Sequence, residues 1–134
     1  MKINIGGSSM KKIVALLVVL ILAIPMVVNA AFSDVAEEHW AKGYIEKLTS
    51  NGVINGYPDG RFGPDETVTY AEATTMAIRA LGYDDEVGKS TEIWPNNYTS
   101  YAKKLDLYDG MGTFTANKGA ARGDVAIVLW NMLR

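Results

Sequence analysis

The stretch INGYPDGRFGPDETVTYAE, Ile54–Glu72, places glycines, prolines and carboxylates between two segments whose apolar residues have helical spacing. Asn55-Gly56 and Pro58-Asp59-Gly60 are turn sequences, because glycine tolerates positive φ and proline fixes its own φ. The stretch ends in Thr69-Tyr70-Ala71-Glu72, a capping box in which the first and last side chains bond each other's backbone amides. It predicts a stiff loop that aims the start of a second helix.

The same loop partly matches a calcium-binding loop. Counted from Asn55, Gly60 and Glu66 fall at the glycine and last acidic positions of the EF-hand pattern. However, Tyr57 takes a position that must supply a side-chain oxygen, and two prolines stiffen a loop that must wrap an ion. We therefore interpret the loop as a turn, and we expect no metal and no cofactor.

Helical periodicity predicts one helix on each side of the loop. Negative charge from Glu37 and Glu38 near the start of the first helix suits the helix dipole. The apolar stripe of this helix consists of Trp40, Tyr44, Ile45 and Leu48. The buried face predicted for the second helix consists of Met76, Ala77, Ala80 and Leu81. Gly52 and Gly82 are placed to end the two helices.

The second half of the chain repeats this pattern. Trp40 aligns with Trp94, and after a two-residue deletion in the loop Glu72 aligns with Asp124. We predict two units of helix, loop and helix at residues 32–83 and 93–134, joined by a polar linker at 84–92. In the second unit Ala121 replaces the capping threonine. Its last helix, Asp124–Leu133, is apolar nearly all round, so it needs cover from another surface.

The N-terminus predicts export. Two lysines precede the apolar run Ile13–Val28, and Val28-Asn29-Ala30 suits signal peptidase. Because the run is shorter than the roughly 18 to 20 residues that cross a bilayer, we predict a signal peptide over residues 1–30, with Met10 as an alternative start. We expect no membrane association after cleavage. The remaining chain is acidic, which excludes a basic surface for nucleic acid.

The chain offers little for catalysis. It has no cysteine, and His39 is its single histidine, so a histidine-based zinc site and a serine triad lack their groups. The acidic pairs Asp65/Glu66 and Asp84/Asp85 lie in turns or in the linker, where carboxylates usually face water. Arg122-Gly123-Asp124 spells RGD, but it lies at a predicted helix start. We therefore predict a protein that is not an enzyme.

Several segments together resemble the S-layer homology repeat: FSDV (32–35), HWA (39–41), GVINGYPDGRFGPDETVTYAE (52–72) and IRALGY (78–83). The second unit looks like a diverged copy. The resemblance implies a mainly α fold in which three repeats form a pseudo-threefold spindle, here incomplete. It also implies a secreted protein on the cell wall or cell surface of a bacterium, chiefly of Gram-positive type. Such domains bind secondary cell-wall polysaccharide non-covalently, and this glycan often carries a pyruvate ketal.

The resemblance further implies where sugar binds. The family's second helix starts with T-R-A-E, whose arginine contacts the acidic sugar, while the tryptophan of the next repeat lines the groove. Arginine suits this role because it grips a carboxylate with two hydrogen bonds. Tyr70 replaces that arginine in the first unit, and Arg122 stands there in the second. The candidate carbohydrate-binding residues are Trp40, Trp94, Arg122, Asp124, Tyr70 and Glu72, with Asp59 and Arg61 as rim contacts.

Two questions stay open at this point. Arg122 lacks the tryptophan of a third repeat, so either the chain is a piece of a longer protein or it self-associates and another chain supplies that repeat. In addition, Tyr70 in place of arginine favours an alternative function. The chain would then be a protein–protein interaction or assembly module that keeps the fold without binding sugar.

Overall fold

The computed structural model describes residues 32–134, and this part of the chain is helix-rich. Its helices are α2 (Lys42–Ser50), α3 (Tyr70–Ala80), α4 (Asp84–Gly88), α5 (Asn96–Lys104) and α6 (Arg122–Met132). Bridge pairing in these residues is limited to an isolated contact between Thr69 and Gly119. The mainly α class expected from the sequence is therefore confirmed. The predicted signal peptide lies outside the described residues, and none of the described helices has the length and apolarity to cross a bilayer.

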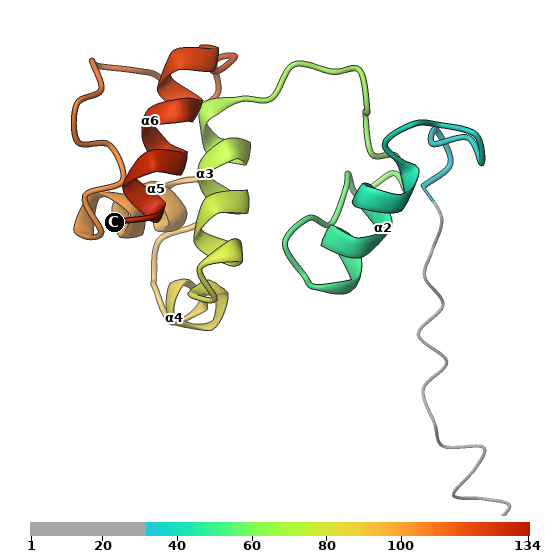
Figure 1. Cartoon of the computed structure of the whole chain (residues 1–134). Coiled ribbons are helices and arrows are strands. Elements are labelled where there is room, and N and C mark those ends of the chain that lie inside the picture. The colour runs from blue at the N-terminus through green and yellow to red at the C-terminus, as the bar shows by residue number, and fades with distance from the viewer. Residues whose placement is uncertain (1–31) are drawn as a thin grey trace, which may run out of the picture.

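The core is built around α3, which packs against both α5 and α6 (Figure 1). Ile78 of α3 and Leu107, which follows α5, are fully buried, and they belong to one cluster with Tyr98 of α5 and Val128 of α6. The predicted linker begins with α4, a short helix that packs on α5 and adds the buried side chain of Val87 to this cluster. The apolar side chains of three helices and the linker thus share one core.

The start of α3 is fully hydrogen-bonded. The capping box is confirmed, since the Glu72 amide donates to Thr69 Oγ1 at 3.2 Å and the Thr69 amide donates to Glu72 Oε2 at 2.8 Å. The amides of Tyr70 and Ala71 donate to carbonyls of the second loop, those of Lys118 (3.0 Å) and residue 116 (2.8 Å). At the start of α6, by contrast, residue 121 makes no side-chain cap, as the sequence predicted.

α2 and its loop stand apart from this core, joined to it by an extended segment that leads into α3 (Figure 1). The loop is held by Asp34, whose carboxylate accepts the amides of Phe62 and Gly63, each at 2.7 Å. These amides hold the pKa of Asp34 below its ordinary value. Gly56 has a φ of +67°, and a Cβ there would collide with the Phe32 ring, so the turn requires glycine.

The first helix begins later than predicted. α2 starts at Lys42, so Trp40 lies in the preceding turn and no acidic residue stands in the first helical turn. Within the expected stripe, Ile45 is buried but Tyr44 is 67% exposed and Leu48 is 42% exposed. The reason is tertiary: α2 lies outside the core cluster, so its apolar face lacks the cover that a packed helix would receive.

The prediction of which side chains α3 buries was wrong in part. Ala77 is buried, but Met76 is half-buried and Ala80 is exposed. The face that α3 buries instead consists of Ala71, Thr74, Thr75 and Ile78, with Ala77 at its edge. The reason is again tertiary, because Met76 and Ala80 border an open groove.

α6 has the uncovered surface that its apolar sequence led us to expect. Only Val128 and Asn131 are buried in this helix. The Asn131 amide group donates to the carbonyls of Leu107 and Asp109, so its polar atoms are satisfied inside the core. In contrast, Trp130 is 66% exposed and Leu133 is 83% exposed.

Ala121→Thr is expected to stabilise the protein. The backbone of residue 121 is already extended, with φ of −70° and ψ of 140°, so a threonine hydroxyl could accept the Asp124 amide as Thr69 accepts that of Glu72. The gain should be about 1 kcal/mol in the free energy of unfolding, measured by urea denaturation. Thr69→Ala is the matched reverse variant and should lose a similar amount. An unchanged urea midpoint in both variants would contradict this account of the caps.

The Asp34 contact makes the first loop sensitive to acid. Because the folded pKa is lowered, the stabilisation is present above the unfolded pKa of about 3.9 and is lost as the pH falls through the folded value. The amide proton resonances of Phe62 and Gly63 should therefore titrate together with a midpoint below 3.9 in an NMR acid titration. Asp34→Asn should remove this transition. A midpoint above the ordinary aspartate value would show that the carboxylate is not stabilised as described.

Candidate carbohydrate-binding site

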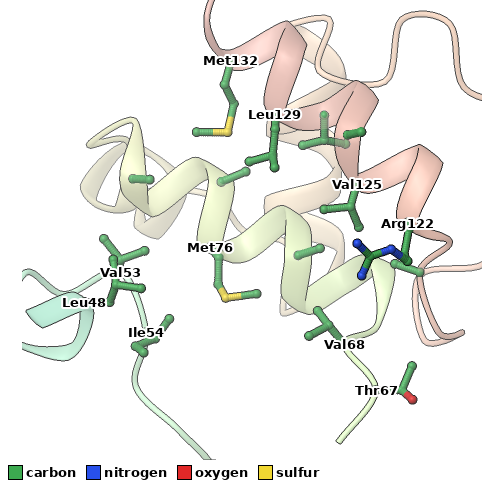
Figure 2. Close-up of a pocket in the computed structure, with 16 residues that line it drawn as sticks. Leu48, Val53, Ile54, Thr67, Val68, Met76, Arg122, Val125, Leu129 and Met132 are labelled. Carbon is green, nitrogen blue, oxygen red and sulfur yellow. The ribbon is translucent and has the colours of Figure 1, made fainter. Parts of the chain in front are cut away.

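Arg122, the first residue of α6, lies at one end of an apolar groove, near Val68 (Figure 2). The groove has a volume of about 790 Å³. Its walls are α3, α6 and the segment around the end of α2, and the large apolar side chains on them are Leu48, Val53, Ile54, Val68, Met76, Val125, Leu129 and Met132. Arg122 is thus a cation at the end of an otherwise apolar surface.

The four arginines of the chain differ in their ion pairing. Arg61 bonds two carboxylates, Arg79 pairs with Asp84 at 2.9 Å, and Arg134 pairs with Asp109 at 2.9 Å. Arg122 makes no ion pair with any residue between 32 and 134. Its charge is therefore not compensated by a protein carboxylate in this part of the chain. An uncompensated, exposed guanidinium is suited to bind an external anion.

Tyr70 stands where the resemblance leads us to expect an arginine, and its polar group is used within the protein. Its hydroxyl donates to Asp124 Oδ2 at 2.5 Å and accepts the Ala121 amide at 3.4 Å. The contact with the carboxylate raises the pKa of Tyr70. The ring also stacks on Phe114, with the ring centroids 4.7 Å apart. Tyr70 and Asp124 therefore tie the start of α6 to the start of α3.

Glu72 is likewise engaged in local structure. Besides its role in the capping box with Thr69, it accepts the Tyr57 hydroxyl at 3.1 Å. This contact joins the first loop to the start of α3. The carboxylate of Glu72 thus has protein donors for both of its oxygen atoms.

The two tryptophans lie in different environments. Trp94 is 50% exposed, and its indole N–H donates to Thr75 Oγ1 at 3.0 Å, so it rests on α3. Trp40 is 82% exposed and stacks on His39 with the ring centroids 5.7 Å apart. Neither indole lines the groove in which Arg122 lies. The structure therefore brings Tyr70 and Asp124 together, but it does not place a tryptophan beside Arg122.

Asp59 and Arg61 form an exposed ion-pair cluster in the first loop. Arg61 Nε donates to Asp59 Oδ2 and Arg61 Nη1 donates to Glu66 Oε1, both at 2.8 Å. Each charge in the cluster therefore has an opposite partner. Among residues 32–134, no three acidic or histidine side chains are arranged to hold a metal ion.

Sequence reasoning missed two polar clusters. One is the Asp34 contact, which lies in the FSDV motif but joins amides far along the chain. The other joins Arg79, Asp84 and Tyr98: Asp84 accepts from both of the other side chains, and the guanidinium lies 5.6 Å from the Tyr98 ring centroid. These contacts hold the pKa of Asp84 below its ordinary value. No spacing rule within one helix or turn would have linked these residues.

Comparison with known proteins gives a family match. Residues 31–74 match the family model described as the S-layer homology domain. The Middle cell wall protein of Brevibacillus brevis is 38% identical over 103 residues, which are 77% of this chain and 9% of that protein. The Cell surface protein of Thermoanaerobacter kivui is 35% identical over 101 residues, 75% of this chain and 12% of that protein.

An enzyme is also among the relatives. The Amylopullulanase of Thermoanaerobacterium thermosulfurigenes is 34% identical over 90 residues, which are 63% of this chain and 5% of that protein. No solved structure matches the chain. The chain spans about a tenth of the length of the first curated relatives, 9% of one and 8% of another. Its sequence places it in the S-layer homology domain family, with the matched domain at residues 31–74.

Proposed function

We propose that the chain is a non-catalytic module that attaches its protein to the bacterial cell wall by binding acidic secondary cell-wall polysaccharide. The observation that carries the proposal is the uncompensated charge of Arg122. The family's arginine position is filled by a tyrosine in the first unit, so Arg122 is the remaining cation at such a position. The names of the relatives, which include cell wall, surface layer and cell surface proteins, support the location.

The chemistry of the site fits an acidic sugar. A pyruvate ketal carries a carboxylate, and a guanidinium binds a carboxylate through two charge-assisted hydrogen bonds. An exposed tryptophan offers a flat apolar face to the C–H side of a sugar ring. The match to the amylopullulanase covers a small fraction of that enzyme, so it is compatible with an attachment module carried by a larger protein.

We also propose that residues 32–83 and 93–134 are two of the three repeats of a pseudo-threefold spindle. The helix lengths support this division: α2 and α5 have 9 residues each, and α3 and α6 have 11 residues each. We expect the protein to reach the cell surface of a Gram-positive type of bacterium through the predicted signal peptide.

One observation favours a second candidate function. Tyr70 is bonded to Asp124, so the first unit offers no cation at this position. Large apolar side chains are also exposed on α6. A protein–protein interaction or assembly module of the same fold would have these features without binding sugar.

Arg122→Ala should weaken retention on purified cell walls about 10- to 100-fold, because charge-assisted hydrogen bonds contribute about 1.5 to 3 kcal/mol. A co-sedimentation assay with walls at increasing protein concentration measures this. Arg134→Ala is the matched control, since Arg134 already pairs with Asp109, and it should bind as the parent chain does.

Walls stripped of their polysaccharide separate the two candidate functions. The parent chain should lose retention on stripped walls, and added salt should weaken its binding to intact walls by screening the ion pair. Equal retention on stripped walls, with no effect of Arg122→Ala, would reject sugar binding and favour the assembly module.

A further inference from the structure

The chain contains two Asn-Gly dipeptides, Asn51-Gly52 and Asn55-Gly56, and both are exposed. An asparagine before glycine is especially prone to lose its side-chain amide, because the glycine nitrogen carries no Cβ-bearing residue that would hinder its approach to the side chain. Asparagine is accordingly one of the thermolabile residues of proteins. The sequence alone does not distinguish the two sites. The structure distinguishes them through the hydrogen bonds of the two glycine amides.

Asn51-Gly52 is locked into the end of α2. Asn51 caps this helix with φ of −87° and ψ of 2°. The Gly52 amide donates to the Thr49 carbonyl at 3.0 Å. The Val53 amide donates to the Leu48 carbonyl at 2.9 Å. Attack of the Gly52 nitrogen on the Asn51 side chain requires rotation about the bond between Cα and the carbonyl carbon of Asn51, and this rotation would break both hydrogen bonds.

The amide of Gly56 is not engaged in this way. It donates to no acceptor among residues 32–134, and both Asn55 and Gly56 lie outside the helices. Glycine is nevertheless required at this position, since its φ is +67° and a Cβ would lie 2.3 Å from Phe32 Cε1 and 2.6 Å from the Arg61 carbonyl oxygen. The fold therefore keeps an unengaged glycine nitrogen directly after an asparagine.

The side chain of Asn55 contacts a cation. In its hydrogen-bonded orientation the amide nitrogen donates to the Ile54 carbonyl at 3.0 Å, and the amide oxygen accepts Arg79 Nη1 at 3.2 Å. Arg79 uses a different atom, Nε, for its bond to Asp84. A guanidinium at the amide oxygen stabilises the negative charge that develops on this oxygen when a nucleophile attacks Cγ. Arg79 therefore favours attack at Asn55.

We propose that Asn55 is a site of spontaneous modification in the folded protein, at which the side-chain amide is lost while Asn51 stays intact. The Gly56 nitrogen gives its proton to hydroxide and forms a bond to Asn55 Cγ. The side-chain nitrogen takes a proton from water, which restores the hydroxide, and leaves as ammonia, so that a five-membered cyclic imide remains. Water then opens the imide. Cleavage of the new bond gives aspartate, and cleavage of the original peptide bond gives iso-aspartate, whose main chain runs through Cγ.

The two products affect the first loop differently. Aspartate keeps the main chain and places a carboxylate oxygen beside Arg79. Iso-aspartate adds one carbon atom to the main chain directly before Gly56, where Phe32 and Arg61 leave no room. The next amide, that of Tyr57, donates to the Arg61 carbonyl at 2.7 Å. The iso-aspartyl chain should therefore lose the tight turn of this loop.

Incubation of the folded chain at mildly alkaline pH tests the site. Peptide mapping by mass spectrometry should show replacement of NH2 by OH about 10- to 100-fold faster at Asn55 than at Asn51, because only Asn51 must break two backbone hydrogen bonds. The rate at Asn55 should rise with pH, since the Gly56 nitrogen reacts without its proton. In concentrated urea the two rates should converge, because unfolding removes the protection of Asn51.

Asn55→Gln is the matched variant, because glutamine would have to close a six-membered ring, which forms far more slowly. The variant should lose the modification at position 55 and keep the parent rate at Asn51. Far-UV circular dichroism checks that each chain keeps its helices during the incubation. Equal rates at the two asparagines of the folded parent chain would overturn the proposal. So would an Asn55 that stays intact in the folded chain while both sites react in urea.

Arg79→Met tests the contribution of the guanidinium, since methionine keeps much of the apolar stem of arginine. Modification of Asn55 should slow about 10-fold, as expected for loss of one charge-assisted hydrogen bond, and the rate at Asn51 should not change. An unchanged or faster rate at Asn55 would exclude Arg79 from the reaction. The site itself would then stand on the comparison of Asn55 with Asn51.

The iso-aspartyl chain, isolated by chromatography, tests the effect on the first loop. Its amide proton resonances for Tyr57, Phe62 and Gly63 should differ from those of the parent chain, whereas Asn55→Asp should keep them close to the parent positions. Parent-like resonances in the iso-aspartyl chain would contradict the loss of the turn. None of these measurements involves cell walls, so their failure is distinguishable from a failure of the sugar-binding proposal.

Discussion

The hydrogen bonds at the start of α3 hold the two halves of the core together. The amides of Tyr70 and Ala71 donate to carbonyls of the second loop, and the Tyr70 hydroxyl donates to Asp124 of α6. The capping box orders the same turn from the other side through Thr69 and Glu72. Because this turn fixes the direction of α3, it also fixes where α5 and α6 can pack. The core of the described chain depends on that placement.

The side chain at position 70 decides whether the start of α3 bonds to the protein itself or can reach an external ligand. With tyrosine at position 70, the side chain bonds a carboxylate of the protein and stacks on Phe114. An arginine there could instead reach an external anion. In the first unit this position therefore provides a structural contact between α3 and α6. Arg122 is the arginine without a carboxylate partner among the described residues, and this is why the functional proposal concentrates on α6.

Comparison of α3 with α6, and of α5 with α2, shows that the burial of a helix face depends on the helices that pack against it more than on its own sequence. α3 and α6 have the same length, yet the α5-facing side of α3 is buried while the equivalent side of α6 is exposed. The difference between α5 and α2 is of the same kind, with Tyr98 buried and Tyr44 exposed. Exposed apolar side chains that lie together on a small protein are typical of an interaction site.

The sequence by itself determined the local structure: the mainly α class, the capping box at Thr69 and Glu72, and the absence of a cap at Ala121. It also located the helix-ending glycines, since Gly52 and Gly82 have φ of +72° and +80°. These features depend on groups within one helical turn. Only the tertiary structure decided that α3 buries its Ile78 side, that Asp34 holds a distant loop, and that Tyr70 bonds Asp124. Such contacts join residues far apart in sequence, and no local spacing encodes which surfaces meet.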